Sequence, residues 1–159
     1  MIVVGVDGSR GSYVALEWAL AEAKLRGVPL RVVNAYHSPA LLVDGLAMSA
    51  PGVPASGATS EDFDRMRAAS EADARRVLER ALADVDARSE GVAVESEAVE
   101  GTPSQVLIAA ARDAELLVVG SRGRGGFAGL LLGSVSQQCA QHPPCPVVIL
   151  PPAPDADEA

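Results

Sequence analysis

Short apolar runs alternate with longer helical stretches along the chain, and this alternation constrains the fold more than any other feature. We expect strands at residues 2–6, 30–36, 92–99, 116–119 and 146–150. The stretches between them place apolar residues at three- and four-residue spacing, which is typical of amphipathic helices. Strand–helix alternation predicts an α/β fold, in which helices cover both faces of a parallel sheet.

Residues that favour the start of a helix precede each of the expected helices. Helices are predicted to begin after Ser9, at about Glu61, at Thr102-Pro103 and at Ser134. Thr102 is expected to cap its helix, with Gln105 at the capping-box position. Ser134 is expected to cap the last helix, with Gln137 in the same relation to it. The helix from Glu61 is expected to end near Ser89, and the one from Thr102 near Asp113.

The length of 159 residues suits one domain, which we expect to cover residues 1–150. Residues 37–60 contain three prolines with many Ala, Gly and Ser, which predicts a loop. That loop is longer than most connections, so it is expected to be a lid or an insertion. The tail at residues 151–159 is acidic and proline-rich and is expected to be disordered.

Charge and composition exclude several classes of partner. The formal net charge is −8 and Lys24 is the single lysine, whereas nucleic acids and anionic membranes favour a basic surface. The sequence shows neither a secretory signal nor a stretch of about 20 apolar residues, so we expect a cytoplasmic protein. Cys139 and Cys145 have no recognisable metal or redox spacing.

A glycine loop follows the expected strand at 116–119. It contains Gly120 and Gly123, and Gly133-Ser134 then opens a helix. Glycine lets a backbone approach a ligand closely, and a helix N-terminus presents N–H groups to an anion. Asp7 ends the first strand, and ligands of parallel sheets bind beyond the carboxyl ends of the strands. If the first and fourth strands are neighbours, both loops form one phosphate-binding crevice.

Three common motifs do not account for this loop. A Walker A loop requires a lysine after its last glycine, and none is near. Residues 123–128 fit a loose GxGxxA pattern, but no acidic residue follows at about 20 positions, as a dinucleotide site requires. A GxSxG nucleophile elbow is absent around Ser9, because Asp7 stands where its first glycine belongs.

The spacing Gly120-x2-Gly123-x9-Gly133-Ser134, with the opening Val3-Val4-Gly5-Val6-Asp7-Gly8-Ser9, closely resembles the universal stress protein family. Further matching stretches are Val33-Asn34-Ala35, Glu100-Gly101-Thr102-Pro103 and Cys145-Pro146-Val147-Val148. The resemblance implies an open five-stranded sheet of order 3-2-1-4-5, which is Rossmann-like or adenine nucleotide alpha hydrolase-like. The complete glycine motif is similar to the ATP-binding branch of that family.

The resemblance also implies a ligand and its contacts. The ligand would be ATP, with Mg²⁺ or Mn²⁺ as an accompanying ion. The implied binding residues are Gly5, Val6, Asp7, Ala35, Val119, Gly120, Arg122, Gly123, Gly133, Ser134 and Val135. Asp7 can equally cap the first helix, and Arg122 and Arg124 can equally be solvated loop residues. Asn34 departs from the family, in which many members carry His there.

These residues suggest a nucleotide-dependent regulator or sensor in a stress response, acting through a downstream protein that the sequence does not identify. No general base, nucleophile or lysine is placed to help phosphoryl transfer. A slow ATPase or phosphotransfer enzyme is the alternative from another class, and a nucleotide-free dimeric scaffold is a third. The resemblance implies a homodimer paired through the fifth strand, at residues 147–150.

Overall fold

The chain folds around one parallel sheet, which a computed structural model describes for residues 1–37, 59–86, 91–123 and 131–151. Its strands are β1 (Ile2–Gly5), β2 (Leu30–Tyr36), β3 (Val94–Glu100), β4 (Leu116–Gly120) and β5 (Val147–Leu150). They lie in the order β3-β2-β1-β4-β5, and each neighbouring pair is parallel. The predicted strand order and parallel sheet are therefore confirmed.

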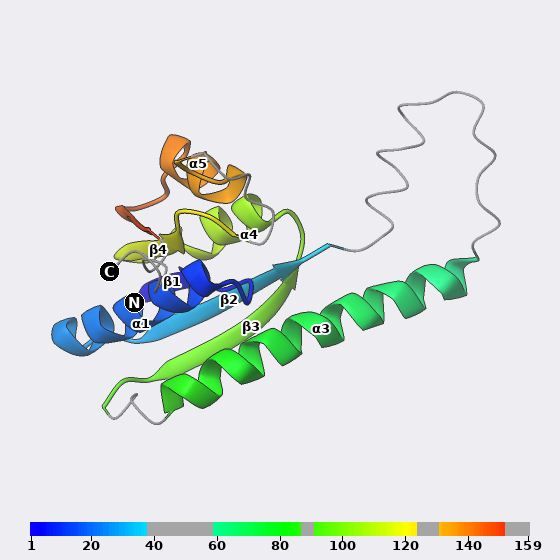
Figure 1. The fold of residues 1–159 in the computed structure, drawn as a ribbon, viewed down its shortest axis with the longest axis horizontal. Helices are drawn as coiled ribbons and strands as arrows, with labels where there is room; N and C mark the ends of the chain where they lie inside the picture. Colours follow the sequence, from blue (N-terminus) through cyan, green and yellow to red (C-terminus); the bar gives the residue numbers. More distant parts are fainter. Residues whose placement is uncertain (38–58, 87–90, 124–130, 152–159) are drawn as a thin grey trace, which may run out of the picture.

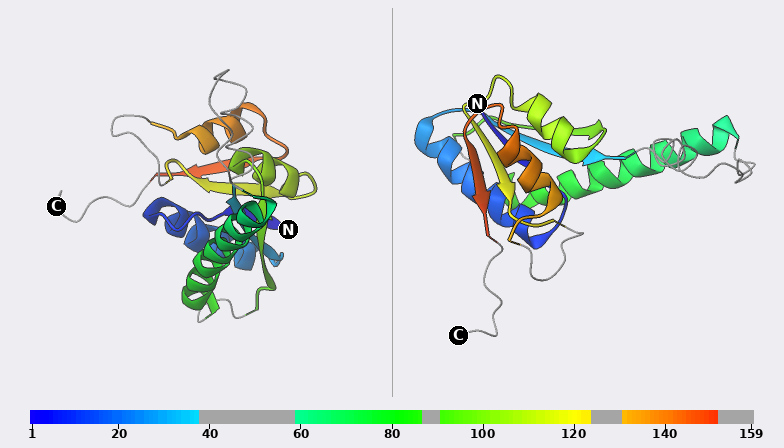
Figure 2. Two further views of the ribbon diagram at one scale, coloured as in Figure 1. Left: turned by 90° about the vertical axis from the view of Figure 1, so that its right-hand side faces the viewer. Right: turned by 90° about the horizontal axis from the view of Figure 1, so that it is seen from above.

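Helices cover both faces of this sheet (Figures 1 and 2). The helices are α1 (Arg10–Arg26), α3 (Ser60–Asp86), α4 (Pro103–Ala110) and α5 (Ser134–Gln141). Helices α1 and α3 pack on one face, and α4 and α5 pack on the other. Each face therefore has its own layer of core between sheet and helices.

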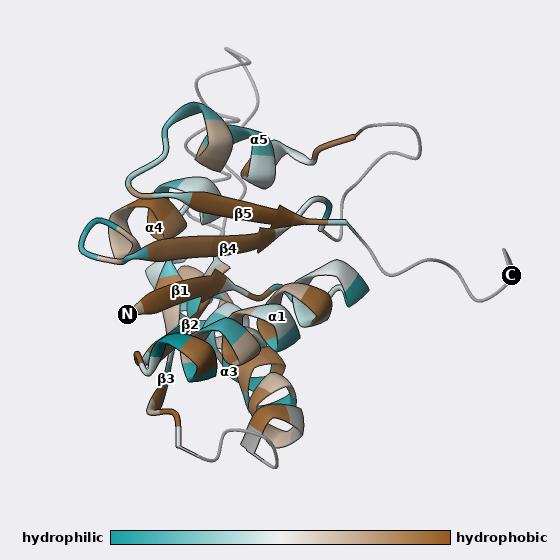
Figure 3. Ribbon diagram, turned by 90° about the vertical axis from the view of Figure 1, so that its left-hand side faces the viewer, coloured by the Kyte–Doolittle hydropathy of each residue, from teal (hydrophilic) through white to brown (hydrophobic). Residues whose placement is uncertain are grey.

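The central strands are apolar because both of their faces are covered. Figure 3 shows β1 and β4 as continuously hydrophobic ribbons. Val4 and Val118 belong to the core layer beneath α1, whereas Val3 and Leu117 belong to the opposite layer. All four side chains are fully buried. Each such side chain contributes about 1.5–3 kcal/mol relative to an exposed position.

Several element boundaries differ slightly from the prediction. β1 ends at Gly5 rather than Val6, although the N–H of Val6 still donates to the carbonyl of Val33. β3 begins at Val94 rather than residue 92, after the carbonyl of Ala93 has paired with β2. α4 ends at Ala110 rather than near Asp113, because a tighter turn follows it.

The ends of α1 follow the sequence signals. The Ser9 side chain accepts a hydrogen bond from the N–H of Ser12, so the predicted cap is confirmed. The helix ends at Gly27, which has a φ of 66° in the left-handed region. At α4 Thr102 is the N-cap and Pro103 occupies the first turn, but the Thr102 side chain makes no capping hydrogen bond. The expected capping box with Gln105 is therefore wrong.

Helix α3 extends beyond the sheet (Figure 1). Its 27 residues make it roughly 40 Å long, whereas the seven residues of β2 or β3 span roughly 23 Å. Among its described side chains the first buried one is Ala74. The segment from Ser60 to Ser70 therefore projects past the edge at which β2 and β3 end.

The predicted loop at 37–60 and the predicted tail lie mostly outside the described residues, at 38–58 and 152–159. Ser60 proves to be the first residue of α3, one position before the predicted start. The predicted end of this helix at Ser89 lies outside the described residues. Within the described ranges, no helix combines the length and apolar character that a membrane crossing requires.

Candidate functional site

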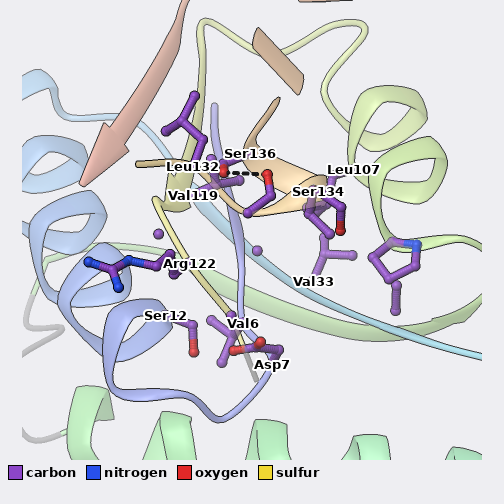
Figure 4. Close-up of a pocket in the computed structure, with 17 residues that line it drawn as sticks. Val6, Asp7, Ser12, Val33, Leu107, Val119, Arg122, Leu132, Ser134 and Ser136 are labelled. Carbon is purple, nitrogen blue, oxygen red and sulfur yellow. Dashed lines mark hydrogen bonds between the residues drawn. The ribbon is translucent and has the colours of Figure 1, made fainter. Parts of the chain in front are cut away.

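A cavity of about 490 Å³ opens at the carboxyl ends of β1, β2 and β4, between α4 and the start of α5 (Figure 4). Its volume lies in the usual range for small-molecule sites. Every binding residue implied by the resemblance lines it: Gly5, Val6, Asp7, Ala35, Val119, Gly120, Arg122, Gly123, Gly133, Ser134 and Val135. Arg124 lies outside the described residues.

The loops after β1 and β4 meet at one end of this cavity. A Cβ atom added to Gly123 would lie 2.5 Å from Oδ2 of Asp7. The absence of a side chain at Gly123 therefore lets its backbone lie directly against the Asp7 carboxylate. The predicted convergence of the two loops is present in the structure, since β1 and β4 are neighbours.

Asp7 also organises the start of α1. Its Oδ1 accepts hydrogen bonds from the Ser9 N–H at 2.9 Å and from the Ser9 hydroxyl at 2.6 Å. The hydroxyl of Ser12 donates to the carbonyl of Ser9 at 2.8 Å. Figure 4 shows Asp7 and Ser12 together below the cavity. Asp7 therefore holds the capping residue Ser9 and does not itself cap α1, and it also lines the cavity.

Glycines also allow α1 and α4 to pack closely against the site. A Cβ at Gly120 would lie 2.9 Å from the backbone of Gly11, so only glycine lets the end of β4 approach α1 this closely. A Cβ at Gly5 would lie 2.7 Å from a methyl group of Leu107 on α4. The missing side chain at Gly5 thus makes room for Leu107, which forms part of the cavity wall.

The end of the cavity near β2 and α4 is apolar. It is lined by Val33 and Ala35 of β2 and by Pro103 and Leu107 of α4. In Figure 4 Val33 and Leu107 lie across the cavity from Arg122. The site therefore has one apolar side and one side made of glycine backbone, Asp7 and Arg122.

The start of α5 differs from the prediction. Gly133, not Ser134, is the N-cap, and Ser134 is the first helical residue. Gly133 has no side chain with which to cap the helix, so the expected capping box with Gln137 is wrong. The first N–H groups of a helix have no partner within the helix. α5 therefore begins at the cavity without a side-chain cap.

Arg122 also lines the cavity, and its side chain carries an unsatisfied donor. Its Nε is buried, and no described residue accepts a hydrogen bond from it. A buried N–H without an acceptor costs about 1–3 kcal/mol. In Figure 4 the guanidinium group of Arg122 lies on the opposite side from Ser134 and Leu107.

Asn34 supports the site from the sheet. Its side-chain amide, 6% exposed, donates to the carbonyl of Val6 at 2.6 Å. The N–H of Val6 donates to the carbonyl of Val33, so both backbone polar groups of Val6 are bonded to β2. Asn34, at the position where many family members carry His, thus supplies a hydrogen-bond donor behind the cavity wall.

Sequence reasoning missed six lining residues: Ser12, Val33, Pro103, Leu107, Leu132 and Ser136. Val33 precedes Ala35 by two positions and so lies on the same face of β2. The alternation of side chains along a strand could therefore have identified Val33 as a lining residue. No motif marked Pro103 or Leu107 as ligand-facing. Ser136 was detectable only as a polar residue on an otherwise apolar helix face.

Neither cysteine has the character of a reactive site. Cys139 is fully buried, and burial raises the pKa of its thiol. Burial also raises the pKa of the Cys145 thiol. Across the described parts of the chain, no group of three or more His, Cys, Asp or Glu side chains could hold a metal ion.

Comparison with known sequences identifies relatives of the whole chain. The family model for the universal stress protein family matches residues 1–151. Universal stress protein Rv2624c of Mycobacterium tuberculosis is 34% identical over 149 residues, covering 94% of this chain and 47% of that protein. Universal stress protein Rv2623 of the same organism is 36% identical over 148 residues, covering 93% and 44%. The chain spans about half the length of these curated relatives.

Solved structures share the fold. Universal stress protein UspA from Lactobacillus plantarum matches with a TM-score of 0.74 at 19% identity, covering 94% of this chain and 95% of that one. A universal stress protein solved in complex with cAMP matches with a TM-score of 0.60 at 26% identity, covering 94% of both chains. A family member from Arabidopsis thaliana with AMP bound matches at 0.59 and 23% identity, covering 94% and 90%. The family model over residues 1–151, with relatives at 34% and 36% identity, shows that this chain belongs to the universal stress protein family.

Proposed function

We propose that this chain binds an adenine nucleotide, with ATP as the ligand, and acts as a nucleotide-dependent regulator. The observation that supports this most directly is the uncapped start of α5 at the cavity, which Arg122 also lines. N–H groups at a helix N-terminus and an arginine suit phosphate. Relatives solved with cAMP and with AMP support the adenine nucleotide class.

The two sides of the cavity suit the two halves of a nucleotide. The apolar side formed by Val33, Ala35, Pro103 and Leu107 offers the contacts that a flat base requires. The opposite side allows a close approach at Gly123 and Gly133. In this proposal the base lies against α4 and the phosphates lie at the start of α5.

A divalent ion, Mg²⁺ or Mn²⁺, would enter with the nucleotide. Asp7 is the only carboxylate among the described residues that line the cavity, and it already accepts two hydrogen bonds from Ser9. One carboxylate cannot replace the several oxygen ligands that these ions require. The phosphates and water would therefore supply most of the coordination.

A regulator is favoured over an enzyme by the chemistry of the cavity. Among its described lining residues, Asp7 and Arg122 are the only ones with ionisable side chains. Rapid phosphoryl transfer requires a positioned nucleophile and charge at the γ-phosphate. Hydrolysis of ATP is therefore expected to be slow, and the signal is expected to pass to a protein partner.

The experiment is mass spectrometry of the ligand that co-purifies with the folded protein, followed by titration with ATP and measurement of ADP release. Retained ATP, with release at the rate of the buffer control, is the expected result. Steady ADP release well above that control would favour the ATPase. Absence of both co-purified and titratable nucleotide would contradict the proposal and favour the scaffold.

We also propose that two copies pair through β5 to form a homodimer. β5 is an edge strand, its four residues are half-buried, and Figure 3 shows it to be as hydrophobic as β4. An apolar edge invites pairing with another chain unless it is covered. A second copy of the same strand would cover this edge.

A further inference from the structure

The carbonyl of Ser121 connects the two ends of the glycine loop. It accepts hydrogen bonds from the N–H of Gly133 at 2.7 Å and from the hydroxyl of Ser136 at 2.7 Å. Ser121 is 7% exposed and Ser136 is 2% exposed, so these bonds are shielded from water. We call the Ser121 carbonyl, the Gly133 N–H and the Ser136 hydroxyl the Ser121 clasp.

The hydroxyl of Ser136 is fully engaged within the protein. It also lies 3.0 Å from the carbonyl of Gly133, in the contact drawn in Figure 4. A hydroxyl has one hydrogen to donate, and two carbonyl oxygens already face it. Ser136 lines the cavity, but its hydrogen is committed to these carbonyl groups rather than to a ligand.

The Ser121 clasp determines which N–H groups remain for a ligand. The N–H of Gly133 is bonded to Ser121, and that of Gln137 makes the first helical bond, to the carbonyl of Gly133. The N–H groups of Ser134, Val135 and Ser136 lie between them, in the first turn, where N–H groups have no helical partner. The clasp therefore fixes the direction of these N–H groups relative to Gly120 and Gly123.

The Ser121 clasp is also anchored to the sheet. The N–H of Ser121 donates to the carbonyl of Leu150, the last residue of β5, at 2.6 Å. Ser121, whose carbonyl holds the start of α5, is thus itself bonded to the edge strand. Movement of α5 relative to the strand ends would require breaking one of these bonds.

We propose that Ser136 is a positioning residue that holds the start of α5 in the orientation that receives the phosphates. The inference rests on the proposed nucleotide binding and adds to it an effect specific to phosphate. Val33, Ala35, Pro103 and Leu107 belong to β2 and α4 and make no part of the clasp. Loss of the Ser136 hydroxyl should therefore weaken binding of phosphates while leaving binding of the base intact.

The test compares ATP with adenosine, which lacks phosphates, by calorimetric titration of wild type and Ser136→Ala. Loss of one buried hydrogen bond at the clasp predicts about tenfold weaker ATP binding. Adenosine affinity is expected to change by less than about twofold, because the base is proposed to contact β2 and α4, which make no part of the clasp. Ser136→Thr retains a hydroxyl that can reach the same carbonyl groups and is expected to keep most of the ATP preference.

Cys139→Ala is the matched control, since Cys139 is a fully buried residue one turn further along α5 and lies outside the clasp. It is expected to lower the melting temperature without changing the ratio of ATP to adenosine affinity. Equal losses of both ligands in Ser136→Ala, or no loss of ATP affinity, would overturn the positioning role. Wild type that binds neither ligand would contradict the proposed function itself, and the inference with it.

Amide hydrogen exchange of the ligand-free protein separates positioning from direct contact. If Ser136 holds the clasp, the Gly133 N–H should exchange roughly five- to tenfold faster in Ser136→Ala. If Ser136 only contacts the ligand, exchange at Gly133 would be unchanged, which would overturn the inference. This measurement also remains informative for a variant too unstable for calorimetry.

Discussion

At the scale of single residues, Gly123 gives the sharpest test of the cavity. In Gly123→Val the new Cβ would lie 2.5 Å from Oδ2 of Asp7, whose carboxylate is held by Ser9 and cannot move freely. The loop must therefore shift away from the strand ends. We expect ATP affinity to fall at least about tenfold, measured by titration, because phosphate contacts depend on close backbone approach.

Gly27→Ala serves as the control for Gly123→Val. Gly27 has a φ of 66° at the end of α1, and an added Cβ there meets nothing within 4 Å. The left-handed conformation costs about 1–2 kcal/mol for a residue with a side chain. This variant should lose stability but retain ATP affinity, and an equal loss of binding would show that Gly123 acts only through stability.

Asn34 gives a second prediction at this scale. Asn34→Leu keeps the approximate volume but leaves the buried carbonyl of Val6 without its donor. An unsatisfied buried carbonyl costs about 1–3 kcal/mol, which denaturant unfolding would measure. Asn34→His retains a donor and should lose less. Equal losses in both variants would contradict the role of the hydrogen bond.

The site residues could be predicted from the sequence where a motif marks a strand end. Asp7, Gly120 and Gly123 follow apolar strands, and the carboxyl ends of neighbouring parallel strands meet. Leu107 could not be predicted in this way, because its position depends on the rotation of α4 about its axis and on the space left by Gly5. The position of Leu107 is set by how α4 packs against β1, and the sequence of neither element alone reveals that packing.

At the scale of elements, the start of α3 depends on protonation. Oδ2 of Asp62 accepts hydrogen bonds from the N–H of Thr59 at 2.9 Å and from its hydroxyl at 2.8 Å. These bonds hold the pKa of Asp62 below its usual value, the backbone bond being the larger cause. Their contribution is therefore fully present above the ordinary pKa of aspartate, about 4, and is lost as pH falls through the lowered value.

We therefore expect the first turn of α3 to fray in acid before the rest of the protein unfolds. The segment from Ser60 to Ser70 has no buried side chain to hold it, so the loss should stay local. Backbone chemical shifts of this segment, recorded from neutral pH to about pH 3, would report the change. Asp62→Asn should remove the pH dependence, and an unchanged acid transition in that variant would refute this account.

Helix boundaries show the limit of local signals at this scale. Ser9 caps α1 as its residue type predicts, with its hydroxyl accepting from the N–H of Ser12. Ser134 has an equally good capping side chain, yet the backbone of Gly133 is bonded to Ser121, and the helix starts one residue earlier than a Ser134 cap would require. A tertiary hydrogen bond outweighed the local preference there.

At the scale of the whole molecule, the proposed homodimer would form through the edge strand β5. The carbonyl groups of Pro146 and Leu150 point toward β4, where they accept hydrogen bonds from the N–H groups of Leu117 and Ser121. Alternate residues direct their backbone groups to opposite edges, so Val147 and Ile149 present theirs outward. Ile149→Pro removes an outward N–H while keeping the bonds to β4, and proline is tolerated at such positions.

Ile149→Pro is therefore expected to give folded monomers if β5 pairs with its counterpart. Light scattering would measure the mass, and circular dichroism would confirm the fold. Leu25→Glu is the control, because Leu25 is 81% exposed on α1 and lies outside β5. A dimeric mass that persists in Ile149→Pro would exclude pairing through this edge.

The contact between Gly5 and Leu107 has a consequence for how this family can diverge. Side chains at positions 5 and 107 compete for the same volume. A methyl group added at Gly5 would lie 2.7 Å from a methyl group of Leu107. A larger residue at the first position thus becomes acceptable only together with a smaller one at the second. Relatives that carry alanine at the end of the first strand are expected to carry a shortened side chain on the facing helix. The two positions should covary although about a hundred residues separate them in sequence.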